Sequence, residues 1–168
     1  MSEFIKGIID WLQSISIPAE LIIFLISLMP ILELRGGLIA AALLGVKFSI
    51  AFPICFIGNI LPIPIILKFF KRIIKWLEKQ NSFIGKAARA LERKVERKSK
   101  KVDAGKAIGL LLFVAIPLPG TGGWTGAMVA SLLDMRIKKS LPIIILGILI
   151  AGIIMSLITY LVPGLFGF

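Results

Sequence analysis

The sequence predicts an all-α integral membrane protein. We expect an inverted repeat in which each half is a re-entrant, broken-helix hairpin followed by a transmembrane helix, with an N-terminal interfacial helix in front. Three observations lead to this fold class. Hydrophobic residues make up 58% of the 168 residues, more than a water-soluble domain could bury. Two apolar runs are interrupted at their centres by proline and glycine, and most basic residues lie in one connecting segment.

The composition excludes several kinds of chemistry. The chain has no histidine, and its single cysteine, Cys55, lies in an apolar run. Zinc, haem and iron–sulfur sites and a histidine-activated nucleophile are therefore not expected. The net charge of +11 does not point to nucleic acid, because fourteen of the twenty Lys and Arg lie within 68–106, as the positive-inside bias of membrane proteins predicts. We expect no cofactor, no metal and no enzymatic activity.

The first element is an amphipathic helix over residues 3–15. Its apolar positions recur at helical spacing, and they are Phe4, Ile5, Ile8, Trp11, Leu12 and Ile15. The segment is too short to cross a membrane, so an interfacial helix anchored by Trp11 is predicted. A solvated N-terminal helix is the alternative.

Residues 18–45 form the first broken apolar run, interrupted from Pro30 to Gly37. Each half has about a dozen residues or fewer, which at 1.5 Å per residue cannot cross a hydrocarbon core roughly 30 Å thick. Glu33 and Arg35 lie at the break. Each would cost about 2.5–3.5 kcal/mol at the centre of a lipid-facing helix, so we expect both to face protein or water.

Residues 48–70 are long enough to span the membrane and complete the first repeat, at about 18–70. The basic connection 71–106 follows, with a helical apolar period between residues 83 and 95. We expect an amphipathic cytoplasmic helix there, attracted to anionic lipid head groups, or else a solvated helix. The second repeat, about 107–163, ends with a span over 141–162.

The second broken run, residues 107–133, contains two prolines and four glycines between residues 116 and 126. A kinked spanning helix and a re-entrant hairpin both fit this pattern. A spanning helix would place the basic residues of 136–139 outside, opposite the basic connection. A hairpin keeps both regions in the cytoplasm, so we predict the hairpin, with both chain termini outside.

The two halves repeat one order of elements. The interval from Pro53 to Gly58 equals that from Pro142 to Gly147, and each pair follows a broken run. One true crossing in each half means that the halves are inverted, as in many secondary transporters.

Two motifs carry a resemblance to a known family. Glu33–Gly37 and Pro117–Ala127 resemble the signature of the putative small multidrug export protein family, short membrane proteins of prokaryotes. More distantly, the order of elements is similar to DedA-type (SNARE-associated, VTT-like) proteins, which are associated with polyprenyl-phosphate or phospholipid translocation. The arginine motif of the second DedA hairpin is absent, since no arginine precedes Arg136 in that region. The resemblance implies a multi-pass transporter in a prokaryotic cell membrane.

A substrate site is predicted where the two tips meet. Half-helices starting at Gly36–Gly37 and Gly122–Gly123 would point their N-termini there and favour an anion. Arg35 offers a fork suited to phosphate, and Glu33 can be its counter-ion, a proton-coupling carboxylate or an acceptor for a cation. Alternatively, the two side chains pair with backbone or each other and only hold the tip. The candidate residues are Glu33, Arg35, Gly36, Gly37, Pro117, Gly120, Thr121, Gly122, Gly123 and Trp124.

Three functions fit this site. They are export of a small solute or drug, translocation of a lipid phosphate, and a scaffold that transports nothing. The expected partners are membrane lipids and a small-molecule or lipid-phosphate substrate. Small residues on the faces of both half-helices allow close helix approach, either between the repeats or between protomers, and we expect a homodimer.

Overall fold

Every regular element in the described part of the chain is helical. The computed structural model describes residues 2–14, 16–78, 103–118 and 120–161. The helices are α1 (Ser2–Ser14), α2 (Ala19–Leu28), α3 (Glu33–Leu43), α4 (Phe48–Ile60), α5 (Ile63–Glu78), α7 (Asp103–Ala115), α8 (Gly123–Leu132), α9 (Ile137–Ser156) and the π-helical turn η1 (Leu157–Leu161). Within these residues, Phe48–Ile74 and Ile137–Tyr160 are long and apolar enough to cross a membrane, which fits both predicted spans.

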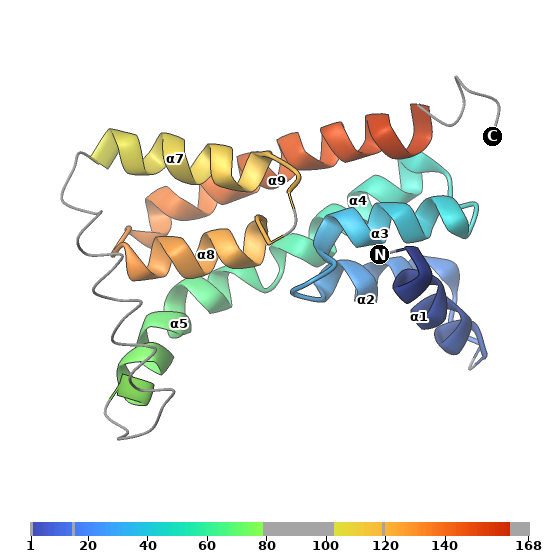
Figure 1. Cartoon of the computed structure of the whole chain (residues 1–168), viewed down its shortest axis with the longest axis horizontal. Helices are drawn as coiled ribbons and strands as arrows, with labels where there is room; N and C mark the ends of the chain where they lie inside the picture. The colour runs from blue at the N-terminus through green and yellow to red at the C-terminus, as the bar shows by residue number, and fades with distance from the viewer. Residues whose placement is uncertain (1, 15, 79–102, 119, 162–168) are drawn as a thin grey trace.

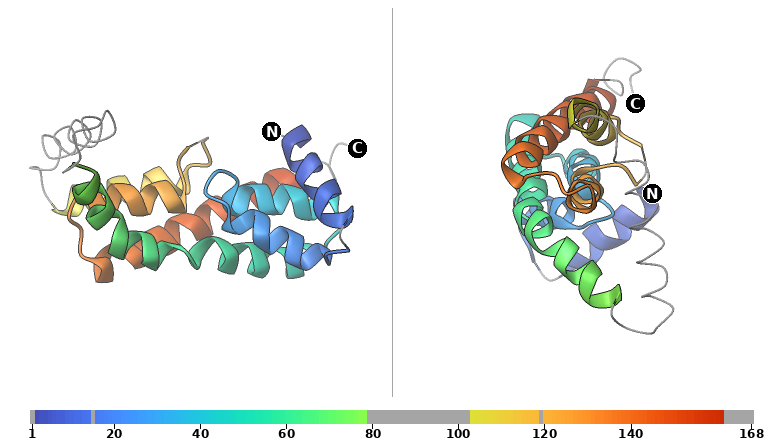
Figure 2. Two further views of the ribbon diagram at one scale, coloured as in Figure 1. Left: turned by 90° about the horizontal axis from the view of Figure 1, so that it is seen from below. Right: turned by 90° about the vertical axis from the view of Figure 1, so that its left-hand side faces the viewer.

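The two long stretches run the length of the molecule, α4 with α5 on one side and α9 on the other (Figure 1). Two helical hairpins pack against these stretches, α2–α3 at one end of the molecule and α7–α8 at the other. The chain reverses direction in each hairpin, and the two turns approach each other near the middle (Figure 2). Both broken runs are therefore hairpins rather than kinked continuous helices, and the N-termini of α3 and α8 both face the centre.

The first break is shorter than the sequence predicts. α2 ends before an extended Met29, and Pro30 follows, whose ring prevents an ordinary continuation of the helix. α3 then begins at Glu33, so the prediction that it starts at Gly36–Gly37 is wrong. The two glycines lie inside the helix, where the absence of a side chain lets neighbouring residues approach closely. A Cβ on Gly37, for example, would lie 2.8 Å from Cys55 Sγ.

The small residues of both hairpins are used for packing within one chain. Ala40 and Ala41 on α3 are fully buried, and α3 packs on α2 and α4. In the second half, a Cβ on Gly147 of α9 would lie 2.7 Å from Val114 of α7, and Gly126 of α8 faces the same valine. These faces bring helices together inside the protomer, which is one of the two uses predicted for them.

The corners that lead from α3 into α4 and from α8 into α9 have the same local structure. Gly45 and Asp134 both adopt a left-handed backbone, with φ of 68° and 55°. The matching hydrogen bonds run from Val46 N–H to Ala41 O and from Met135 N–H to Ala130 O, at 2.9 and 3.0 Å. Gly45 and Asp134 are separated by the same number of residues as Pro53 and Pro142.

The corner at Gly45 gives a simple test of the fold. Nothing lies within 4 Å of the position that a Cβ would occupy, so only the backbone conformation is at stake. We expect Gly45→Val to lower the free energy of unfolding in detergent by about 1–2 kcal/mol, the cost of a left-handed L-residue. Gly45→Asn should cost less, because asparagine tolerates this conformation. Equal stability of Gly45→Val and wild type would contradict the corner geometry.

The N-terminal helix α1 is amphipathic, as predicted. Ile5, Ile9 and Leu12 are buried, while Trp11 is exposed. Phe4 was predicted on the apolar face but is exposed, because α1 turns the side of Ile5 and Ile9 toward the rest of the protein. Its interfacial role stays a prediction, and the predicted amphipathic helix over 83–95 lies outside the described residues.

Candidate functional site: the junction of the two hairpin tips

Glu33 extends from the first hairpin to the second. It is the first residue of α3 and is only 6% exposed. Its carboxylate accepts hydrogen bonds from the backbone N–H groups of Gly123 and Trp124, each at 3.1 Å. These N–H groups belong to the first two residues of α8. The N-cap residue, Gly122, has no side chain that could bind them. A carboxylate suits this position because a helix N-terminus carries partial positive charge.

Arg35 also reaches from α3 to the second hairpin, but it binds acceptors where Glu33 binds donors. Its guanidinium donates to the backbone carbonyls of Leu118 and Ile116, the latter at 3.3 Å, and lies 3.5 Å from the Thr121 hydroxyl. The Thr121 hydroxyl oxygen lies 2.9 Å from each of the same two carbonyl oxygens and shares its single proton between them. These oxygens follow the C-terminus of α7, which carries partial negative charge and favours a cation.

Glu33 and Arg35 therefore form a tip clamp, the name we use for these two side chains and the backbone groups they bind. Among the described residues, the ion pairs join Lys6 to Glu3 and Lys71 to Asp134. Glu33 and Arg35 each bind the opposite hairpin instead of forming such a pair. The start of α8 is predicted to favour an anion, and in this structure the Glu33 carboxylate occupies its N–H groups.

Two glycines make this close approach feasible. A Cβ on Gly122 would lie 2.6 Å from Cδ of Glu33, so any larger residue would displace the carboxylate. A Cβ on Gly123 would lie 2.7 Å from Ile148 Cδ1 of α9. Glu33 itself has φ of 52°, a strained value for a residue other than glycine. Such strain persists only where the surroundings hold it, and here the tip clamp does so.

Asn59 of α4 is a polar residue of the site that the sequence reasoning did not select. It is 2% exposed and lies beside Glu33 in a small cavity of about 10 Å³. That volume is about the size of one water molecule. The Asn59 Oδ1 atom has no hydrogen-bond partner among the described residues. A single amide inside an otherwise apolar span was the signal that could have found it.

A larger cleft of about 310 Å³ lies next to the tip clamp. Polar side chains from both hairpins line it, and apolar side chains from the hairpins and from α9 supply most of the rest. The polar lining residues are Glu33, Arg35, Thr121 and Thr125. The apolar lining residues are Pro30, Ile31, Leu32, Ile39, Pro117 and Met155. A mostly apolar cleft with a few polar groups is typical of a binding site for a small organic molecule.

The sequence model of a family described as "Putative small multi-drug export protein" matches residues 33–154. The chain belongs to this family. The match begins at Glu33, the first residue of α3, and includes the whole second hairpin and α9 up to its last turn. Comparisons with curated proteins and with solved structures found no match. The family and the two long apolar helices together identify a helical membrane protein.

In this small multi-drug export family member, most of the predicted site residues do come together. Glu33, Arg35, Thr121, Gly122 and Gly123 form or border the tip clamp, Trp124 contributes its backbone N–H, and Pro117 and Gly120 line the cleft. Gly36 and Gly37 do not face the site, because they pack against residues of α2, α4 and the preceding turn.

Trp124 also faces a second, almost entirely apolar groove between α1, the first tip and the α4–α5 stretch. Its indole N–H is buried and has no hydrogen-bond partner among the described residues. The side chain packs against the main hydrophobic core.

Proposed function

We propose that this protein is a membrane transporter whose substrate binds in the cleft beside the tip clamp. The observation that carries the proposal is a buried acid and a half-buried base at the start of α3, both bound to the second hairpin and both lining a cleft between the hairpin tips. Charges at this depth are costly, and in membrane proteins they usually mark substrate or ion pathways. The description of the family, which names multi-drug export, supports the same function.

We further propose that the two hairpins are re-entrant and that the halves form an inverted repeat. The shared corner geometry at Gly45 and Asp134 supports this, as does the equal spacing of prolines in α4 and α9. The basic ends of α5 and α9 lie together, where Lys71 bonds Asp134. We assign this end to the cytoplasm, with both chain termini outside.

In the proposed mechanism the tip clamp is the closed state of a gate. A substrate in the cleft competes for the hydrogen bonds of Arg35 and Glu33, and the hairpins then separate on one side at a time. The apolar lining and the charged pair favour a small organic solute with an apolar body and a polar or charged group. No bond is made or broken in the substrate, so the protein is not an enzyme in this proposal.

The transport test uses proteoliposomes loaded with a fluorescent cationic dye. We expect Arg35→Ala and Glu33→Gln to slow dye movement by about tenfold or more, since one charge-assisted hydrogen bond exceeds the roughly 1.4 kcal/mol of a tenfold change. Arg35→Lys should also be slow, because it keeps the charge but loses the fork that reaches two carbonyls. Lys47→Gln, an exposed cation before α4, is the matched control and should transport normally.

The other candidate functions give different results in the same vesicles. Movement of a labelled anionic phospholipid, without movement of the dye, would replace the solute transporter by a lipid-phosphate translocase. If vesicles with the wild-type protein move neither probe faster than vesicles without protein, the scaffold that transports nothing is the remaining function. The homodimer stays a prediction, and the mass of the protein in lipid nanodiscs tests it separately.

A further inference from the structure

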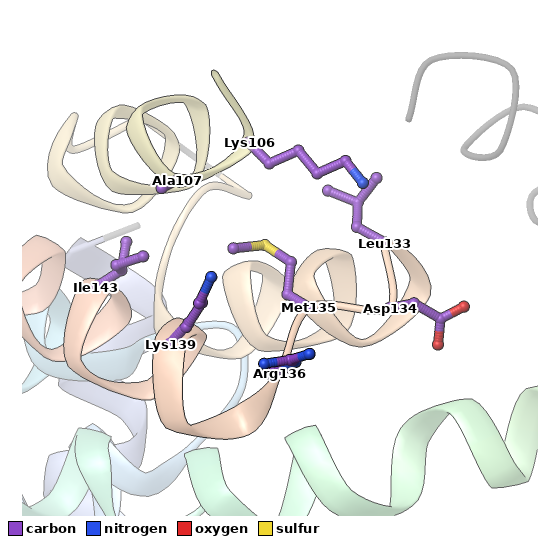
Figure 3. Close-up of a pocket in the computed structure, with 8 residues that line it drawn as sticks. All are labelled: Lys106, Ala107, Leu133, Asp134, Met135, Arg136, Lys139 and Ile143. Atoms are coloured by element: carbon purple, nitrogen blue, oxygen red, sulfur yellow. The ribbon is translucent and has the colours of Figure 1, made fainter. Parts of the chain in front are cut away.

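A further pocket lies at the basic end of the molecule, away from the tip clamp. It has a volume of about 520 Å³ and is bounded by the start of α7, the corner after α8 and the first turns of α9 (Figure 3). Neither the proposed transport cycle nor the fold requires it. Its lining is half polar in character, unlike the apolar groove beside Trp124.

Three cations line this pocket. Lys106 comes from α7, Arg136 precedes α9, and Lys139 comes from the first turn of α9. Figure 3 shows Lys106 extending toward Leu133 and Lys139 directed into the space beneath α7. Cations placed together repel one another, so their common position favours an anionic partner.

The acidic residue of the pocket does not neutralise them. Asp134 points away from the three cations in Figure 3, and its carboxylate bonds the Lys71 ammonium of α5. Among the described residues no ion pair is formed by Lys106, Arg136 or Lys139. The first turn of α9 also has no side-chain cap, so its end adds partial positive charge.

The pocket also has apolar groups in and near it. Ala107 and Ile143 belong to its lining, and Ile108 of α7 and Ile137 of α9, each close in sequence to lining residues, are exposed. A ligand here can place a charged group among the cations and an apolar chain along the two helices. Free phosphate would bind the cations but would make no contact with the apolar sides of the two helices.

We propose that this pocket binds the phosphate of an anionic membrane lipid. Arg136 supplies the planar fork that suits a phosphate, and Lys106 and Lys139 supply two further charges. The glycerol and the first part of the acyl chains lie against Ile143 and the apolar sides of α7 and α9. The lipid thereby connects the start of α7 to the start of α9 at the proposed cytoplasmic end.

The test measures lipid binding to the full-length protein in detergent micelles, by native mass spectrometry during titration with dioleoylphosphatidylglycerol. We expect Lys139→Gln and Arg136→Gln each to weaken binding by about tenfold or more, and Lys139→Arg to retain it. Lys138→Gln is the matched control: it removes the same charge from the same turn, but Lys138 does not line the pocket. Its effect should stay below about fivefold, the general influence of one charge near an anionic surface.

Each other outcome has a clear meaning. Equal weakening by the variants at 136, 138 and 139, or equally tight binding of zwitterionic dioleoylphosphatidylcholine, would overturn the proposal in favour of general surface attraction. Inorganic phosphate added at constant ionic strength distinguishes the source. If it does not displace the lipid, the ligand is the head group with its chains; if it does, the same cations form a site for soluble phosphate. Neither result depends on whether the protein transports a solute.

Discussion

Glu33→Ala is expected to lower the free energy of unfolding by about 3–5 kcal/mol. The substitution removes two hydrogen bonds to a charged acceptor, each worth about 1.5–3 kcal/mol, and leaves the N–H groups of Gly123 and Trp124 without a partner. It also separates the hairpins, because Glu33 is half of the tip clamp. The measurement is a reversible denaturant titration in mixed micelles. A loss of this size is a large fraction of the stability of an ordinary domain.

Two control variants separate the carboxylate from other causes. Glu20→Ala removes an exposed acid from the first turn of α2 and should cost less than about 1 kcal/mol. Glu33→Gly should be less destabilised than Glu33→Ala by about 1–2 kcal/mol, because glycine relieves the left-handed backbone at φ of 52°. This order reverses the usual ranking of alanine and glycine in helices. Equal stability of Glu33→Ala and Glu20→Ala would remove the tip clamp as a stabilising element.

The sequence predicted the helical class, both long apolar helices and the position of both breaks, because each depends on local composition. Proline and glycine between residues 116 and 122 interrupt a helix whatever surrounds them. The start of α3 was mispredicted because glycine has two uses. At Gly36 and Gly37 it permits close packing, and only the neighbouring helices decide between packing and a helix break.

The partners of the charged residues were not predictable in the same way. Burial costs required that Glu33 and Arg35 face protein or water, but the identity of the partner depends on how two hairpins far apart in sequence approach each other. The alternative in which the side chains pair with backbone agrees with the observed hydrogen bonds. This role is compatible with transport, because a gate must be held closed by bonds that can break.

Gly122→Ala is expected to break the Glu33 half of the tip clamp without removing either charged residue. The added Cβ would lie 2.6 Å from Cδ and 2.7 Å from Oε1 of Glu33, so the carboxylate must leave the N-terminus of α8. The backbone at Gly122 is extended, with φ of −179°, so alanine fits the conformation and only the steric overlap matters. We expect a loss of about 1–3 kcal/mol in the free energy of unfolding, typical of an overpacked site. Dye transport should also slow by about tenfold or more.

The control is Gly109→Ala in α7, where a Cβ has open space. That variant should be neutral or more stable by up to about 1 kcal/mol, because alanine is the better helix former. A double-mutant cycle then tests the contact itself. In the presence of Glu33→Ala the carboxylate is gone, so Gly122→Ala has less to displace and should cost little. The two losses would therefore not add, whereas additive losses would show that Gly122 acts on stability through some group other than the Glu33 carboxylate.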